Sequence, residues 1–174
     1  MDWSLGLNRP MRREAHYGDR LFRAFTERPN DLDALIRETA LAHGRREAFV
    51  HGQRRITFSE FDGSLTAVAG NLAARGVGHG ERVGILCDAG IEFMQAMFGA
   101  VRRGAVAVPM GIRQQAPELE FVINNCGITA LVFDAALADR LPAPERTPTL
   151  RHRFSVGGEA EGVEPVEGLL KPCR

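Results

Sequence analysis

Short apolar runs alternate along this chain with longer stretches in which apolar residues recur every three or four positions. The clearest runs are Arg82–Cys87, Ala105–Val108 and Ala130–Phe133, with a weaker one at Arg153–Val156. Runs that are this short and this continuously apolar are typical of strands buried on both faces of a parallel sheet. The alternation therefore predicts strands that are joined through helices covering the two faces of one sheet.

The stretches between these runs have the spacing of amphipathic helices. Gly104 and Gly127 follow two of them, at the position where a glycine commonly ends a helix. Because strand–helix–strand crossovers are right-handed, the predicted fold class is α/β, with a Rossmann-like, mostly parallel sheet flanked by helices. The apolar faces expected to cover the sheet are formed by Ile91, Met94, Met97, Phe98 and Val101 in one helix and by Leu119, Val122, Ile123 and Cys126 in the next.

The most specific local signal is the sequence Thr-Phe-Ser-Glu at 57–60. The Thr57 hydroxyl can accept a hydrogen bond from the Glu60 amide while the Glu60 carboxylate reaches back to the Thr57 amide, an arrangement known as a capping box. Ile56 and Phe61 flank the box at the spacing of a hydrophobic staple. We expect a helix from this point to Gly76, where a glycine can cap its end.

Composition divides the chain into three segments. Residues 1–30 are polar and rich in arginine, and we expect an irregular lead-in with one short helix at 19–26. Residues 31–158 carry the helix and strand patterns and are expected to form the domain; a first helix and a short hairpin over 48–56 precede the capping box. Residues 159–174 contain four glutamates and little apolar content, which predicts a disordered tail.

Charge and cysteine content exclude several classes of function. The 22 basic residues balance 22 acidic ones, which argues against a dedicated nucleic-acid partner because such binding relies on a basic excess. Three cysteines and five histidines share no disulfide or metal-ligand spacing. No stretch approaches the ~18 apolar residues of a membrane span, and the first residues lack the apolar run of a signal peptide. We therefore expect a cytoplasmic protein without a metal site.

Two glycine-containing segments superficially resemble nucleotide loops. Gly76-Val77-Gly78-His79-Gly80 follows a predicted helix and precedes a predicted strand, the reverse of the order that a dinucleotide fingerprint requires. We interpret it as a helix cap and a tight turn. Gly157-Gly158 does follow a strand, but no helix pattern comes after it, so we interpret it as a turn as well.

Asp88 and Asp134 lie where predicted strands end, at the edge where doubly wound folds bind ligands. Each also comes just before a predicted helix, so N-capping is the favoured interpretation and a ligand site is the alternative. Ser59 sits inside the capping box without a base placed to activate it. Arg102 and Arg103 are placed to complement a helix C-terminus. These residues predict a fold without a catalytic constellation.

Several segments resemble motifs of a known enzyme family. Ile56–Phe61 resembles the first core motif of the AMP-forming adenylating enzymes, which include acyl-CoA synthetases, luciferases and peptide-synthetase adenylation domains. Val101–Met110 resembles the second core motif. Leu72–Val83, Ala116–Ile123 and Ala130–Asp134 are also similar to the usual sequence of that family.

The resemblance extends from about Asp31 to Val156 and implies the N-terminal subdomain of such an enzyme. It implies that the full-length enzyme uses ATP, Mg²⁺ and coenzyme A. A carboxylate would attack the α-phosphate of ATP, pyrophosphate would leave, and the acyl group would pass from the acyl-adenylate to a thiol. The sequence Ile112-Arg113-Gln114 favours acyl-CoA ligases slightly over peptide-synthetase domains. A carboxylic acid and coenzyme A are then the expected substrates.

The family's functional motifs have no counterpart in this sequence. Its Ser/Thr/Gly-rich phosphate loop with a lysine, its aromatic-Gly-Thr-Glu motif, its ribose-binding aspartate and its C-terminal lysine are not found, and the only lysine, Lys171, matches none of them. The resemblance therefore assigns no catalytic, cofactor-binding or metal-binding residue. We expect these 174 residues to be inactive alone. Two alternatives are an interaction module that docks on a partner supplying the missing subdomains, and a Rossmann-like binder of a small ligand.

Overall fold

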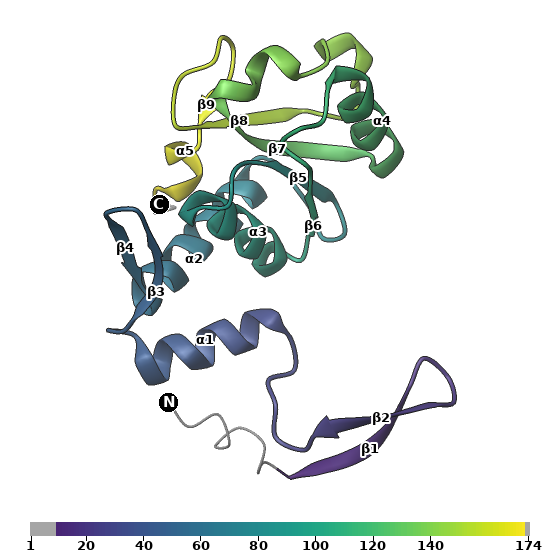
Figure 1. Ribbon diagram of the computed structural model, residues 1–174, viewed down its shortest axis with the longest axis vertical. Helices are drawn as coiled ribbons and strands as arrows, with labels where there is room; N and C mark the ends of the chain where they lie inside the picture. Colours follow the sequence, from purple (N-terminus) through teal and green to yellow (C-terminus); the bar gives the residue numbers. More distant parts are fainter. Residues whose placement is uncertain (1–9, 173–174) are drawn as a thin grey trace.

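A parallel sheet forms the centre of the molecule. The computed structural model describes residues 10–172, and its five-stranded sheet has the order β6-β5-β7-β8-β9 (Figure 1). All four neighbouring pairs run parallel, which confirms the predicted α/β class. The strands are β5 (Arg82–Leu86), β6 (Val106–Pro109), β7 (Ile128–Asp134), β8 (His152–Val156) and β9 (Glu164–Pro165).

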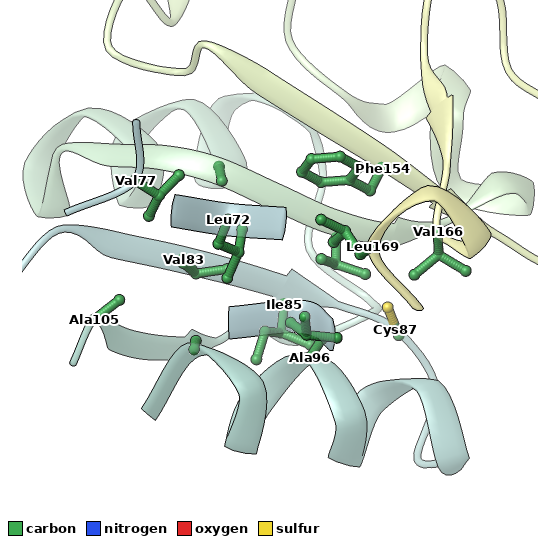
Figure 2. Packing of buried hydrophobic residues seen from close by; sticks show 14 residues of the cluster. Leu72, Val77, Val83, Ile85, Cys87, Ala96, Ala105, Phe154, Val166 and Leu169 are labelled. Atoms are coloured by element: carbon green, nitrogen blue, oxygen red, sulfur yellow. The ribbon is translucent and has the colours of Figure 1, made fainter. Parts of the chain in front are cut away.

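Helices cover both faces of this sheet. The helices α2 (Phe58–Ala74), α3 (Ile91–Arg103) and α5 (Glu167–Leu170) pack on one face, and α4 (Ala116–Cys126) packs on the other. Side chains of β5 pack on both faces of the sheet. Val83 and Ile85 belong to the first hydrophobic core, on the side of α2 and α3, and Leu86 belongs to the second, on the side of α4. Figure 2 shows the first core, in which Val83 and Ile85 lie among Leu72, Ala96, Phe154 and Leu169.

The predicted elements ahead of the sheet are also present. Helix α1 spans Leu32–His43, and the strands β3 (Glu47–His51) and β4 (Arg54–Thr57) form the expected hairpin. The capping box is formed: the Glu60 N–H donates to the Thr57 hydroxyl at 3.3 Å, and the Thr57 N–H donates to the Glu60 carboxylate at 2.8 Å.

The N-terminal lead-in differs from the prediction. Residues 19–26 were expected to contain a short helix, but β2 (Arg20–Phe25) pairs antiparallel with β1 (Met11–His16). Gly18, with a φ of +87°, reverses the chain between the two strands. Leu21 and Phe25 have the spacing of one helical face, but antiparallel pairing with β1, across a three-residue turn, determines the conformation.

The acidic tail is not disordered over its described residues, contrary to expectation. Val166 is 4% exposed and Leu169 is fully buried in the first core. The side-chain amide of Asn71 donates to the carbonyls of Leu169 and Lys171 at 3.0 and 2.8 Å. Two apolar side chains and one amide thus hold the tail against α2. The proline-rich stretch 142–150 forms a loop, within which Pro144–Arg146 is a 3₁₀ turn (η3). A second 3₁₀ helix, η2 (Ala135–Arg140), precedes it.

Arg102 ties three helices together. Its side chain is 4% exposed and pairs with Asp33 of α1 at 2.5 Å and with Asp62 of α2 at 2.6 Å. It also donates to the Thr66 hydroxyl at 2.9 Å. Burial acts to raise the pKa of Asp33, but hydrogen bonds from Arg37 and Arg102 outweigh it and hold that pKa below its usual value.

Helices α2 and α3 approach closely at Gly99. A Cβ at this position would lie 2.6 Å from the Cβ of Val68, which is far inside van der Waals contact. Gly63, in the middle of α2, has the opposite surroundings, because a Cβ there would meet no atom within 4 Å. A methyl group would therefore clash with α2 at Gly99 but would meet no neighbouring atom at Gly63.

We expect Gly99→Ala to lower the free energy of unfolding by roughly 1–3 kcal/mol, because the helices must move apart to admit the methyl group. Gly63→Ala is the matched control, and it should raise that free energy by about 0.5–1 kcal/mol through better helix propensity. Urea unfolding of both variants checks the prediction. A neutral or stabilising effect of Gly99→Ala would contradict the close approach.

Arg102→Gln should lower the free energy of unfolding by roughly 2–4 kcal/mol near neutral pH, because it leaves Asp62 without its cation and Asp33 with Arg37 alone. The lowered pKa of Asp33 contributes stability that is present above the pKa of the unfolded chain. That contribution is lost as the pH falls through the folded-state pKa. The difference between wild type and variant in urea unfolding should therefore shrink below about pH 4. Arg113→Gln is the control, and a difference that does not vary with pH would contradict an ionic role.

Candidate functional site

The carboxyl ends of β5 and β7 form a topological switch point. The chain leaves β5 through α3 to β6 on one side and returns through α4 to β7 on the other. Doubly wound sheets bind ligands where the connections diverge in this way. A cleft of about 290 Å³ lies here, lined by His51, Arg54, Cys87, Asp88, Gly90, Glu92, Asp134, Val156, Gly157, Val166 and Glu167.

Asp88 and Asp134 meet at this edge, as their positions after two strands predict. The Asp134 carboxylate accepts a hydrogen bond from the backbone N–H of Asp88 at 2.7 Å. The favoured capping interpretation is wrong for Asp88, because Gly90 is the N-cap of α3. Asp134 does occupy the N-cap position of η2, as expected, but its side chain makes no capping hydrogen bond there. Asp88 is too early to cap because Ala89 and Gly90 still have to turn the chain into α3.

Sequence reasoning missed several residues that line the cleft. His51 and Arg54 come from the β3–β4 hairpin, and Arg54 forms an ion pair with Glu92 of α3 at 2.6 Å. Glu167 comes from the tail that was expected to be disordered. No local pattern placed these residues at the sheet edge, since each reaches it through tertiary packing.

The lining of the cleft is predominantly acidic. Asp88, Asp134, Glu92 and Glu167 contribute four carboxylates, and the one arginine, Arg54, already pairs with Glu92. Such a lining opposes a phosphate group, which is normally held by backbone N–H groups and cations. The residues described at this edge therefore do not form a phosphate cradle.

Cys87 is not a nucleophile in this setting. It is buried at the end of β5, and burial together with the charges of Asp134, Glu92 and Asp88 raises its pKa to about 12. The thiolate is the reactive form, so a thiol with this pKa stays inert near neutral pH.

The other segments singled out in the sequence have structural roles. Gly76 and Gly80 take φ values of +73° and +76° in the turn between α2 and β5, and Gly157 takes +74° after β8. Arg103 donates to the carbonyl of Val77 at 2.8 Å. Across residues 10–172, no group of three His, Cys, Asp or Glu side chains is arranged to hold a metal ion. In the same range no helix has the length and apolar character needed to cross a bilayer.

Comparison with known proteins agrees with this architecture. Residues 36–166 match the sequence model of the AMP-binding enzyme family, which is about three quarters of the chain. The chain belongs to the AMP-binding enzyme family. The segments similar to its first and second core motifs lie at structural junctions, where β4 enters α2 and where α3 turns into β6.

Individual relatives include two CoA ligases and a linear gramicidin synthase. The chain is 35% identical over 63% of its length to 3-hydroxybenzoate–CoA ligase of Aromatoleum sp. and 31% identical over 63% to the long-chain-fatty-acid–CoA ligase FadD13 of Mycobacterium tuberculosis. It is 32% identical over 67% to a linear gramicidin synthase of Brevibacillus parabrevis. The chain spans 21%, 22% and 2% of these three proteins, respectively.

A solved structure shows the same fold. The inhibitor-bound N-terminal domain of FACL13 from Mycobacterium tuberculosis superposes with a TM-score of 0.68 and 26% sequence identity. The superposition covers 71% of this chain and 33% of that one. The chain thus corresponds to the N-terminal portion of an adenylate-forming enzyme.

Asp134→Ala removes the carboxylate that accepts the Asp88 N–H hydrogen bond and should therefore loosen the turn after β5. Hydrogen bonds to charged groups contribute about 1.5–3 kcal/mol. We expect amide hydrogen exchange at Asp88 to accelerate by roughly tenfold to a hundredfold. Asp134→Asn keeps an acceptor and should keep most of the protection. Asp139→Ala, at an exposed position in η2, is the control. Unchanged protection at Asp88 in the alanine variant would contradict the anchoring role.

Proposed function

We propose that this chain is the N-terminal portion of an AMP-forming acyl-CoA ligase. In that reaction a carboxylic acid is activated by ATP as an acyl-adenylate, and coenzyme A then takes the acyl group as a thioester. The observation that carries the proposal is the family match over residues 36–166, together with the relatives that are named CoA ligases. Fatty acids and aromatic acids are both within the proposed substrate class, since the two ligases differ in this respect.

The proposed role of these 174 residues is to build and stabilise one side of the enzyme. The described residues do not provide a cluster of Mg²⁺ ligands, and the cleft at the switch point is acidic. We therefore assign no chemical step to them and propose that the chain alone does not form the adenylate. ATP, Mg²⁺ and coenzyme A would be bound by the subdomains that complete the enzyme.

We further propose that the chain works in the cytoplasm against those complementary subdomains, in the same polypeptide or in a partner. Cys87 and Cys126 are free thiols, in keeping with a reducing compartment. Leu35 and Leu41 on α1 are 47% and 88% exposed, and exposed apolar residues of this kind often mark contact surfaces.

A second candidate is a free-standing binder of a small ligand. The cleft beside Asp88 and Asp134 favours it, because it lies where doubly wound sheets bind ligands. Its acidic lining would suit a cationic or hydrogen-bond-donating ligand rather than a nucleotide.

The purified chain should show no carboxylate-dependent exchange between ATP and pyrophosphate with fatty or aromatic acids. A chimera should restore the exchange: residues 36–166 replace the matching segment of 3-hydroxybenzoate–CoA ligase, and 3-hydroxybenzoate is the test acid. As a matched comparison, the same residues also replace the corresponding segment in the adenylation domain of the linear gramicidin synthase. This second chimera tests whether the chain suits a peptide synthetase instead.

Robust exchange by the chain alone would overturn the proposed inactivity. A chimera that folds, as judged by its melting temperature, but does not exchange would overturn the ligase assignment. A ligand that raises the melting temperature of the isolated chain, but not of its Asp134→Ala variant, would favour the second candidate.

A further inference from the structure

The β1–β2 hairpin stands apart from the rest of the fold. Its strands pair only with each other, and Figure 1 shows the hairpin beyond α1, on the side away from the sheet. A two-stranded hairpin without a covering layer is marginally stable in water. Contact between one face of this hairpin and another surface would therefore stabilise the hairpin.

That face carries a cationic row between two apolar rows. Residues directly opposite in an antiparallel pair share a face, and alternate rows along the strands return to it. Arg13 lies opposite Arg23, and like charges in this position repel. Within residues 10–172 neither guanidinium has a carboxylate within 4 Å, whereas on the other face Glu14 is engaged by Arg12 and Arg28. The flanking rows are Met11 with Phe25 and Ala15 with Leu21.

Apolar groups continue to the tip of the hairpin. Leu21 is 63% exposed and Tyr17 is 89% exposed. Tyr17 takes a φ of +54°, a conformation that is unfavourable for a large side chain. Its ring contacts Phe22 edge-on, with the ring centroids 6.4 Å apart. Leu21 therefore extends the face that carries Arg13 and Arg23, whereas the Tyr17 ring packs toward the opposite face, beside Phe22.

We propose that the β1–β2 hairpin docks on the surface of an anionic phospholipid bilayer. Such a surface offers phosphates above an apolar layer, which matches a row of arginines set between apolar rows. The aliphatic stems of Arg13 and Arg23 can lie along the apolar layer while their guanidinium groups pair with phosphates. This proposal is independent of the proposed enzymatic function.

The charge complementarity favours lipid over a self-complementary protein contact. A second copy of this face would place arginines against arginines. The cytoplasmic leaflet, in contrast, carries an excess of anionic lipid. Binding of lipid phosphates would also remove the repulsion between Arg13 and Arg23, so the contact and the stability of the hairpin would reinforce each other.

The test is co-sedimentation of the 174-residue chain with vesicles of phosphatidylcholine alone and of phosphatidylcholine with phosphatidylglycerol. We expect binding to the anionic vesicles only, weakening as salt is raised. The double variant Arg13→Gln with Arg23→Gln should lower the partition coefficient by roughly twenty-fivefold, since each arginine near an anionic surface contributes about a fivefold change. It should leave the melting temperature unchanged or raised, because it removes a like-charge pair.

Leu21→Ser should also weaken binding, whereas Arg113→Gln with Phe121→Ser, two exposed positions outside the hairpin, should not. A Tyr17→Trp variant in a Trp3→Phe background should show a blue-shifted emission with anionic vesicles if the tip enters the interface.

Three results would overturn the proposal. They are absence of binding to anionic vesicles, equal binding to neutral vesicles, and binding that the double variant leaves unchanged. Self-association of the chain that is lost in the double variant would instead assign this face to a second copy, which also overturns it.

Discussion

Strands β5 and β7 carry apolar side chains on both faces, and neither face can be left in water. Val83 and Ile85 face α2 and α3, while Leu86 and Leu131 face α4. Helices must therefore lie on both sides of the sheet, and parallel strands can only be joined by crossovers long enough to contain them. Right-handed crossovers through α3 and α4, on opposite faces, then place β6 and β7 on the two sides of β5. The cleft at the carboxyl ends of β5 and β7 follows from this topology before any functional side chain is considered.

The contacts that close the helical layer lie in the same segments as the family motifs. The first motif, Ile56–Phe61, begins α2 with a capping box, and the second, Val101–Met110, contains Arg102 and the turn into β6. Gly99, one turn earlier on α3, allows the close approach to Val68. The motifs thus fix where α2 starts and how α3 packs on it. Both motif segments thus have a structural role in the packing of the helices.

Elements that are determined by capping residues and by their own composition were predictable, and those that depend on pairing or packing with another segment were not. The capping box joins residues three apart, and the buried strands show in their own composition. The conformation of Arg20–Phe25 depends on pairing with β1, and the order of the tail depends on Leu169 reaching the core and on Asn71, about a hundred residues away. The Asp134 side chain does not cap η2 for the same reason, because its hydrogen-bond donor is the amide of Asp88 in another segment.

The charge of the cleft limits what can bind at this edge of the sheet. A nucleoside triphosphate carries several negative charges. The cleft is already lined by four carboxylates, those of Asp88, Asp134, Glu92 and Glu167, which would repel it. Charges a few ångströms apart interact by several kcal/mol at the effective dielectric of a protein surface. Arg54 offers little compensation because Glu92 already neutralises it. An adenylating reaction at this edge therefore requires cations from outside the described residues, so the carboxyl ends of β5 and β7 supply the shape of a site but not its electrostatics.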